Sequence, residues 1–65
     1  MKPVKERILE LLKEIYPQDL PIKEIAERAG VSRTTASKYI TILEVEGVVV
    51  CRFVGRAKLC RAKER

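Results

Sequence analysis

The sequence predicts a single α+β domain in which three short helices precede a two-stranded β-hairpin. Apolar residues recur at helical spacing as far as about residue 46, and a run of β-branched residues begins at Val48. Gly30 and Gly55 fall between the predicted elements, where tight turns need them. A chain of 65 residues that is 46% hydrophobic and 35% charged is typical of one folded domain with a thin core. We therefore expect one domain over residues 1–65.

The first two helices are predicted from apolar spacing. Residues 3–16 place Pro3 in a first helical turn and then repeat apolar side chains on one face: Val4, Ile8, Leu11, Leu12 and Ile15. Two prolines interrupt the pattern, and residues 20–22 could form a short extra strand. A second helix is expected over residues 22–29.

The third helix and the hairpin follow from turn chemistry. Gly30 can adopt the positive φ that ends a helix, and Ser32 can cap a new helix over residues 33–46. Strands are predicted over residues 48–54 and 57–61, joined by a two-residue turn at Gly55-Arg56. The polar residues 62–65 are expected to fray.

The segment around Gly30 fits a helix-turn-helix motif. Such a motif needs small residues where its helices cross and a glycine in the turn, which Ala26, Ala36 and Gly30 supply. Residues 22–61, with "IAERAGVSRTTASKYITILEVEGVV" followed by "GRAKL", resemble winged helix-turn-helix transcriptional regulators, including archaeal ones and the ArsR-like and MarR-like groups. The resemblance implies that the third helix enters the major groove of DNA and that the hairpin, the wing, lies on the backbone or in the minor groove.

Helical geometry assigns a groove-facing surface to the third helix. Ala36, Ile40 and Leu43 point inward, and the opposite arc holds only hydroxyls and cations: Arg33, Thr34, Ser37, Lys38 and Thr41. Arg33 is the best candidate for reading a guanine, because its guanidinium can make two parallel hydrogen bonds. Ser32 and Tyr39 complete the predicted DNA-binding set, with the Tyr39 ring at the core edge and its hydroxyl near a phosphate. A merely solvated helix face is the alternative.

The wing carries three further predicted DNA contacts, Arg52, Arg56 and Lys58, with Arg56 at the tip. The alternative is an edge hairpin whose charges prevent aggregation, and both interpretations can hold together. Phe53 is expected to pack rather than to stack on a base.

The excess of positive over negative charge lies entirely in the second half of the chain. Residues 1–30 hold six basic and six acidic residues, whereas residues 31–65 hold eight and three, which gives the whole net charge of +5. A polyanionic partner would explain this distribution, and solubility alone is the other explanation.

Cys51 and Cys60 face each other in the predicted hairpin as a non-hydrogen-bonded pair. Three states stay open: reduced packing thiols, a structural or redox-responsive disulfide, and metal ligation shared between two subunits. Metal is the least favoured, because the chain contains no histidine.

These features predict a DNA-binding regulator with double-stranded DNA as partner and no cofactor. No nucleophile-and-base arrangement suggests an enzyme, no small-molecule ligand is evident, and the absence of an apolar leader or span predicts a cytoplasmic, nucleoid-associated protein with no membrane partner. A homodimer is expected, through the first helix and Tyr16, with Ile42 and Val45 exposed or covered by a neighbour. A winged-helix module that binds only proteins is the alternative function, with RNA binding a weaker third.

Overall fold

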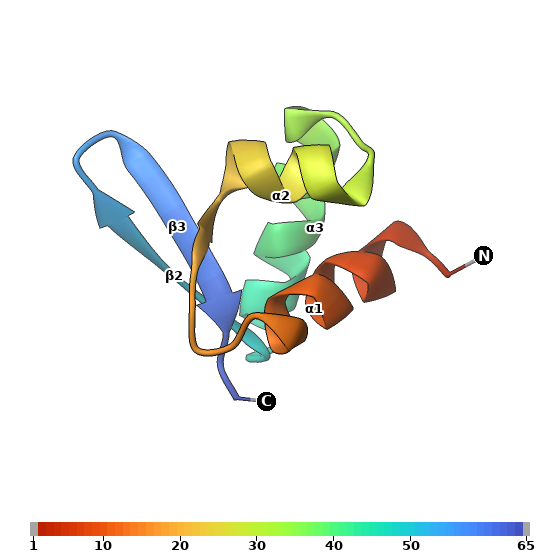
Figure 1. The fold of residues 1–65 in the computed structure, drawn as a ribbon, viewed down its shortest axis with the longest axis horizontal. Coiled ribbons are helices and arrows are strands. Elements are labelled where there is room, and N and C mark those ends of the chain that lie inside the picture. Colours follow the sequence, from red (N-terminus) through yellow and green to blue (C-terminus); the bar gives the residue numbers. More distant parts are fainter. Residues whose placement is uncertain (1, 65) are drawn as a thin grey trace.

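The computed structural model describes residues 2–64 as three helices and a three-stranded antiparallel sheet (Figure 1). The elements are, in chain order, α1 (Val4–Glu14), β1 (Leu20–Pro21), α2 (Ile22–Ala29), α3 (Arg33–Val45), β2 (Val49–Val54) and β3 (Ala57–Ala62). The predicted fold class is therefore confirmed. The short extended piece expected near residue 20 is a strand, which pairs with β3 and gives the sheet order β1-β3-β2.

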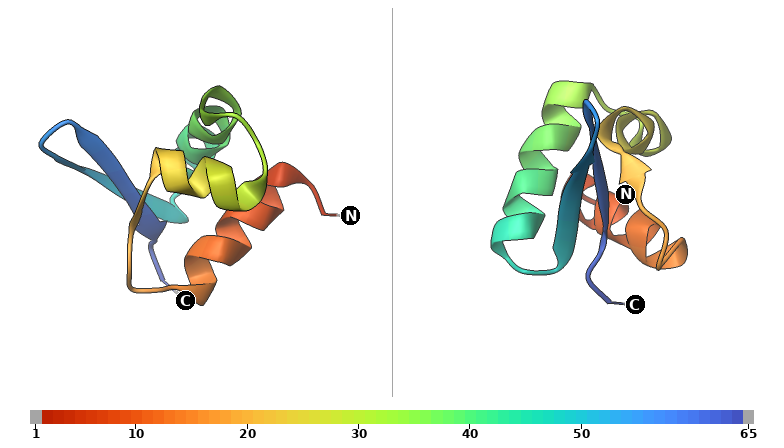
Figure 2. Two further views of the ribbon diagram at one scale, coloured as in Figure 1. Left: turned by 45° about the horizontal axis from the view of Figure 1, so that its top comes forward. Right: turned by 90° about the vertical axis from the view of Figure 1, so that its left-hand side faces the viewer.

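The helices enclose the core, and the hairpin projects beyond it (Figure 2). Six large side chains from α1, α2, α3 and β3 are fully buried: Ile8, Leu12, Ile25, Ile40, Leu43 and Cys60. Their burial follows the apolar spacing that predicted the helices. Helix α1 ends at Glu14, two residues earlier than expected, because Pro17 disfavours helical backbone in the residue before it.

The turn between α2 and α3 forms as the sequence indicates. Gly30 has a φ of +72°, and the Val31 amide donates to the carbonyl of Ala26 at 3.0 Å, which closes the end of α2. Ser32 then caps α3, because its Oγ accepts a hydrogen bond from the Thr35 amide at 3.1 Å. These two caps fix the angle at which α3 leaves α2.

The hairpin has the predicted register, with Val54 opposite Ala57 and Cys51 opposite Cys60. Gly55 takes a φ of +60° at the first position of the two-residue turn. The expectation of a frayed tail from residue 62 does not hold at its start: Ala62 ends β3 and is fully buried, and the Lys63 amide donates to the Val48 carbonyl at 3.0 Å. Residue 65 lies outside the described residues.

Candidate nucleic-acid interface

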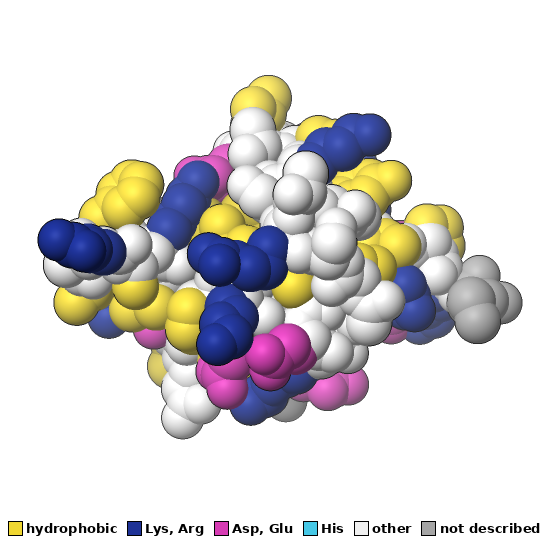
Figure 3. Space-filling view, turned by 90° about the horizontal axis from the view of Figure 1, so that it is seen from above, with side chains coloured by type: hydrophobic (Ala, Val, Ile, Leu, Met, Phe, Trp, Pro, Cys, Tyr) yellow, Lys and Arg dark blue, Asp and Glu magenta, His cyan; other side chains and the backbone are white. Residues whose placement is uncertain are grey.

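An open groove of about 1090 Å³ lies between α3, the start of α2 and the tip of the wing. Its lining residues come from these three parts of the chain: Pro21, Ile22 and Lys23; Arg33, Thr34, Ser37, Lys38 and Thr41; and Arg56, Ala57 and Lys58. Five of them are cations, three carry hydroxyl groups, and none of these lining residues is acidic. Viewed from above in Figure 3, Lys and Arg side chains lie at the tip of the wing and near the centre of the face, with hydrophobic side chains between them and Asp or Glu side chains beside the central ones.

All five α3 residues assigned to the polar arc by helical geometry line this groove together. The opposite side of α3 is anchored by Ala36, Ile40 and Leu43, each with no exposed surface. A helix buried on one side can offer the other side rigidly to a partner. Arg33, Thr34 and Lys38 are exposed, so their polar groups are available to bind.

Ser32 and Tyr39, the other two residues predicted to contact DNA from around the third helix, do not line the groove. Both hydrogen-bonding functions of the Ser32 hydroxyl are used locally, since it accepts from the Thr35 amide and donates to Thr35 Oγ1 at 3.0 Å. The Tyr39 ring packs at the core edge as expected, and Lys38 Nζ lies 5.6 Å from its centroid. Tyr39 therefore contacts a groove residue without lining the groove itself.

The wing cations lie on two different faces of the sheet. Alternation along the strands puts Lys58 on the side of the cysteines, facing α3, and Arg52 on the other side. Arg52 Nε donates to Asp19 Oδ2 at 2.8 Å, and with Arg61 it lines a separate polar pocket of about 450 Å³. Arg52 is thus separated from the groove that Arg56 and Lys58 line.

The wing tip is more exposed than the sequence suggested. Phe53 was expected to pack, but 75% of its surface is accessible, and its ring lies 6.0 Å from Lys58 Nζ. The reason is that β2 runs beyond the core here, with only β3 beside it. Arg56, at the turn, is also exposed.

Lys23 lines the groove and was missed by sequence reasoning. It reaches the wing because β1, the two residues before α2, pairs with β3. The sequence predicts the short extended piece at residues 20–22, but it does not predict that this piece pairs with β3. Knowledge of that pairing would have placed the start of α2 beside the hairpin.

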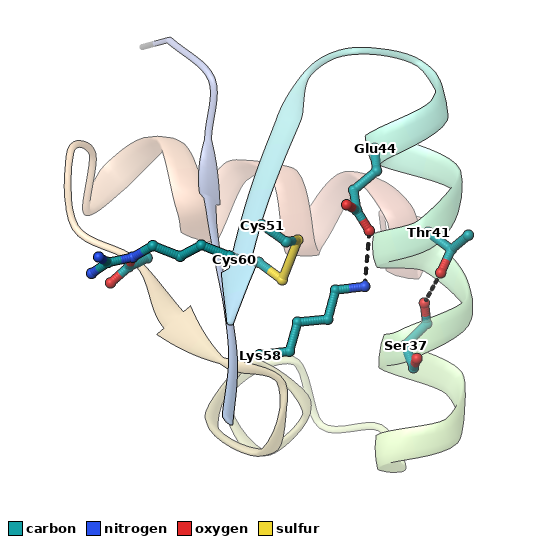
Figure 4. The surroundings of a disulfide bond; sticks show 8 residues. Ser37, Thr41, Glu44, Cys51, Lys58 and Cys60 are labelled. Carbon is teal, nitrogen blue, oxygen red and sulfur yellow. Dashed lines mark hydrogen bonds and ion pairs between the residues drawn. A yellow bond between two sulfur atoms is a disulfide. The ribbon is translucent and has the colours of Figure 1, made fainter. Parts of the chain in front are cut away.

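Cys51 and Cys60 form a disulfide in the structure, the second of the three states left open by the sequence. Their Cα atoms are 4.1 Å apart, as expected for a non-hydrogen-bonded antiparallel pair. Figure 4 shows the bridge and Lys58 on the side of the hairpin that faces α3. Within residues 2–64, no group of three or more potential ligands gathers at a metal site, and no helix is long and apolar enough to cross a bilayer.

The fold is that of a winged helix-turn-helix domain: α2 and α3 form the motif, and β2 and β3 form the wing. Residues 4–58 match the family model described as "HTH domain", and the chain belongs to this family. A comparison with curated proteins finds no match to the chain.

The solved structures that share the fold include two transcriptional regulators. One is the homodimeric winged helix-turn-helix DNA-binding domain of a possible ArsR-family transcriptional regulator from Mycobacterium bovis, with a TM-score of 0.79 and 29% identity, covering 91% of this chain and 52% of that one. The other is a MarR-family transcriptional regulator from Silicibacter pomeroyi, with a TM-score of 0.84 and 23% identity, covering 97% of this chain and 42% of that one. The chain thus spans about half the length of the solved chains that it resembles. The resemblance to the ArsR-like and MarR-like groups expected from the sequence is confirmed at the level of fold.

Proposed function

We propose that the protein binds double-stranded DNA as a small transcriptional regulator, with α3 in the major groove and the wing on the backbone or in the minor groove. The observation that carries the proposal is the gathering of five cations and three hydroxyls in one groove whose lining contains no acid. Phosphate neutralisation by such cations supplies most of the sequence-independent affinity for DNA. Membership of the HTH family and the fold of the two regulators support it.

The chemistry of the α3 side chains suggests different tasks. Arg33, in the first turn, can make a bidentate contact with guanine, and the free amides at the start of α3 favour a nearby phosphate. Thr41 Oγ1 already donates to the Ser37 carbonyl at 3.0 Å, so its oxygen remains an acceptor. We assign Thr41 to a base amino group rather than to a phosphate, which offers no donor.

The wing contributes through its tip. Arg56 follows the turn glycine and is exposed, and it lines the same groove as Lys23 and Arg33. Arginine at this position suits the narrow minor groove, whose negative potential attracts a guanidinium. Arg52, which is paired with Asp19 on the other face, is not part of this contact set.

Fluorescence anisotropy with a mixed-sequence duplex of about 20 base pairs, two turns of B-DNA, tests the proposal. Each phosphate contact contributes about 0.9 to the slope of log K against log salt concentration. We expect affinity to fall steeply with salt and to weaken in Arg33→Ala. Affinity that does not change with salt would contradict a phosphate-binding groove, and no binding even at low salt would favour the module that binds only proteins.

We further propose that the protein acts as a homodimer, because one winged helix reads a single short half-site. The M. bovis domain is described as homodimeric. Helix α1 and the end of α3 form one continuous side, tied by an ion pair between Lys5 and Glu46, and next to it Val45 exposes 83% of its surface. Tyr16, two residues after the end of α1, is also partly exposed. This side is the proposed dimer surface, and DNA binding would place the dimer on the nucleoid.

A further inference from the structure

We propose that Glu44 and Lys58 are a positioning pair that sets the separation of the wing from α3, and that Lys58 is not itself a phosphate contact. The inference rests on the proposed DNA binding and refines it. Of the five cations in the groove, four bind phosphate or bases, and the fifth, Lys58, ties the wing to α3 and so fixes the width of the groove.

Lys58 Nζ lies 3.0 Å from Glu44 Oε1, and this pair is part-buried. Its side chains are 27% and 32% exposed, whereas each of the other three ion pairs described within residues 2–64 has a partner that is at least 44% exposed. Shielded charges are less screened by water and salt than exposed ones. The Glu44–Lys58 contact is therefore the ion pair of the described chain best suited to fix a geometry.

The two residues come from the two parts of the groove that must be held apart. Glu44 is in the last turn of α3 and Lys58 is on β3, and Figure 4 shows the lysine side chain extended across the gap between them. The Phe53 ring near the ammonium adds a second contact on the wing side. A phosphate would have to compete with Glu44 for the charge of Lys58.

The remaining groove cations differ from Lys58 in this respect. Among residues 2–64, none of Lys23, Arg33, Lys38 and Arg56 forms an ion pair with an acidic side chain. Their charges are free for a ligand, whereas the charge of Lys58 is already neutralised. The groove thus contains four cations that are available to bind DNA and one, Lys58, that is already paired with Glu44.

The outer wing needs such a tether because core packing does not hold it. Arg52, Phe53 and Val54 are exposed along β2, and the disulfide joins β2 to β3 without joining the sheet to α3. The contact between Lys58 and Glu44 joins the sheet to α3 close to the tip of the wing. The position of Arg56 relative to Arg33 then depends on the pair.

A double-mutant cycle with the mixed-sequence duplex tests the assignment. We expect Glu44→Gln and Lys58→Met each to weaken binding about tenfold, the size of one lost charge-assisted contact, and the double variant to be no weaker than either. The matched control is Glu27→Gln, which makes the same change in charge on α2, outside the groove lining and the proposed dimer surface, and is expected to bind as tightly as the original protein or slightly more tightly. Adding Arg56→Ala to Glu44→Gln is expected to cost less than it costs alone, which a general loss of stability would not produce.

Tighter binding by Glu44→Gln than by Glu27→Gln, with weaker binding by Lys58→Met, overturns the assignment, because it identifies Lys58 as a phosphate contact that Glu44 restrains. Fully additive losses in the double variant overturn it as well. If the original protein fails to bind the duplex even at low salt, the proposed function itself is wrong, and the role of the pair falls with it.

Discussion

Cys51 and Cys60 lie directly opposite each other on β2 and β3, at the boundary between the core and the exposed wing. Toward the base of the hairpin, Val49 and Ala62 are buried, whereas toward the tip Phe53 and Ala57 are exposed. The bridge therefore joins the edge strand to the central strand at the last point where the core supports both.

Reduction of this disulfide is expected to lower the free energy of unfolding by about 2–3 kcal/mol, because the bridge closes a loop of about ten residues in the unfolded chain. Urea denaturation with and without a dithiol reductant measures the difference. Cys51→Ala/Cys60→Ala should not respond to the reductant. Protein from its native host that yields two alkylatable thiols without reduction would contradict the bridge.

Arg56→Ala is expected to weaken DNA binding and to reduce the salt slope by about 0.9, the loss of one phosphate contact. Arg52→Ala provides the comparison, because it removes the same group from the other face of the hairpin, where Asp19 holds it. We expect its effect to be clearly smaller. Equal effects of the two substitutions in anisotropy titrations would show that the groove-facing side of the wing has no special role.

Ser32→Ala is expected to cost about 1 kcal/mol of stability, because it removes the acceptor for the Thr35 amide at the start of α3. Ser37→Ala is the control, since Ser37 lies within α3 and its hydroxyl caps no helix end. Thermal unfolding followed by circular dichroism compares the two. A Ser32 variant as stable as the Ser37 variant would argue against the cap.

Val45→Asp is expected to dissociate the proposed dimer without unfolding the monomer, because the side chain is 83% exposed. A charge buried without a partner in an interface costs several kcal/mol. Sedimentation velocity of the original protein and the variant gives the oligomeric state. A variant that remains dimeric places the interface elsewhere.

Much of this arrangement could be predicted from local rules. The arc from Arg33 to Thr41 follows from a rotation of about 100° per residue, and the pairing of Cys51 with Cys60 follows from a two-residue turn and strict alternation. The same hairpin register also predicts that Arg52 and Lys58 lie on opposite faces of the sheet.

The ion pairs could not be predicted in this way. Asp19 meets Arg52, and Glu44 meets Lys58, only because the sheet packs against the helices at a particular angle. That angle is set by the buried side chains and by the pairing of β1 with β3, which join segments distant in sequence. This packing angle cannot be derived from the spacing of residues along the chain.

The sheet order β1-β3-β2 also has a consequence for synthesis. Leu20 pairs with Cys60, so β1 is synthesised about 40 residues before its partner on β3, and β2 likewise depends on β3. The helices can form from local contacts while the chain grows, but the sheet waits for its central strand. Until translation has passed Ala62, the nascent chain has a helix-turn-helix motif with no wing.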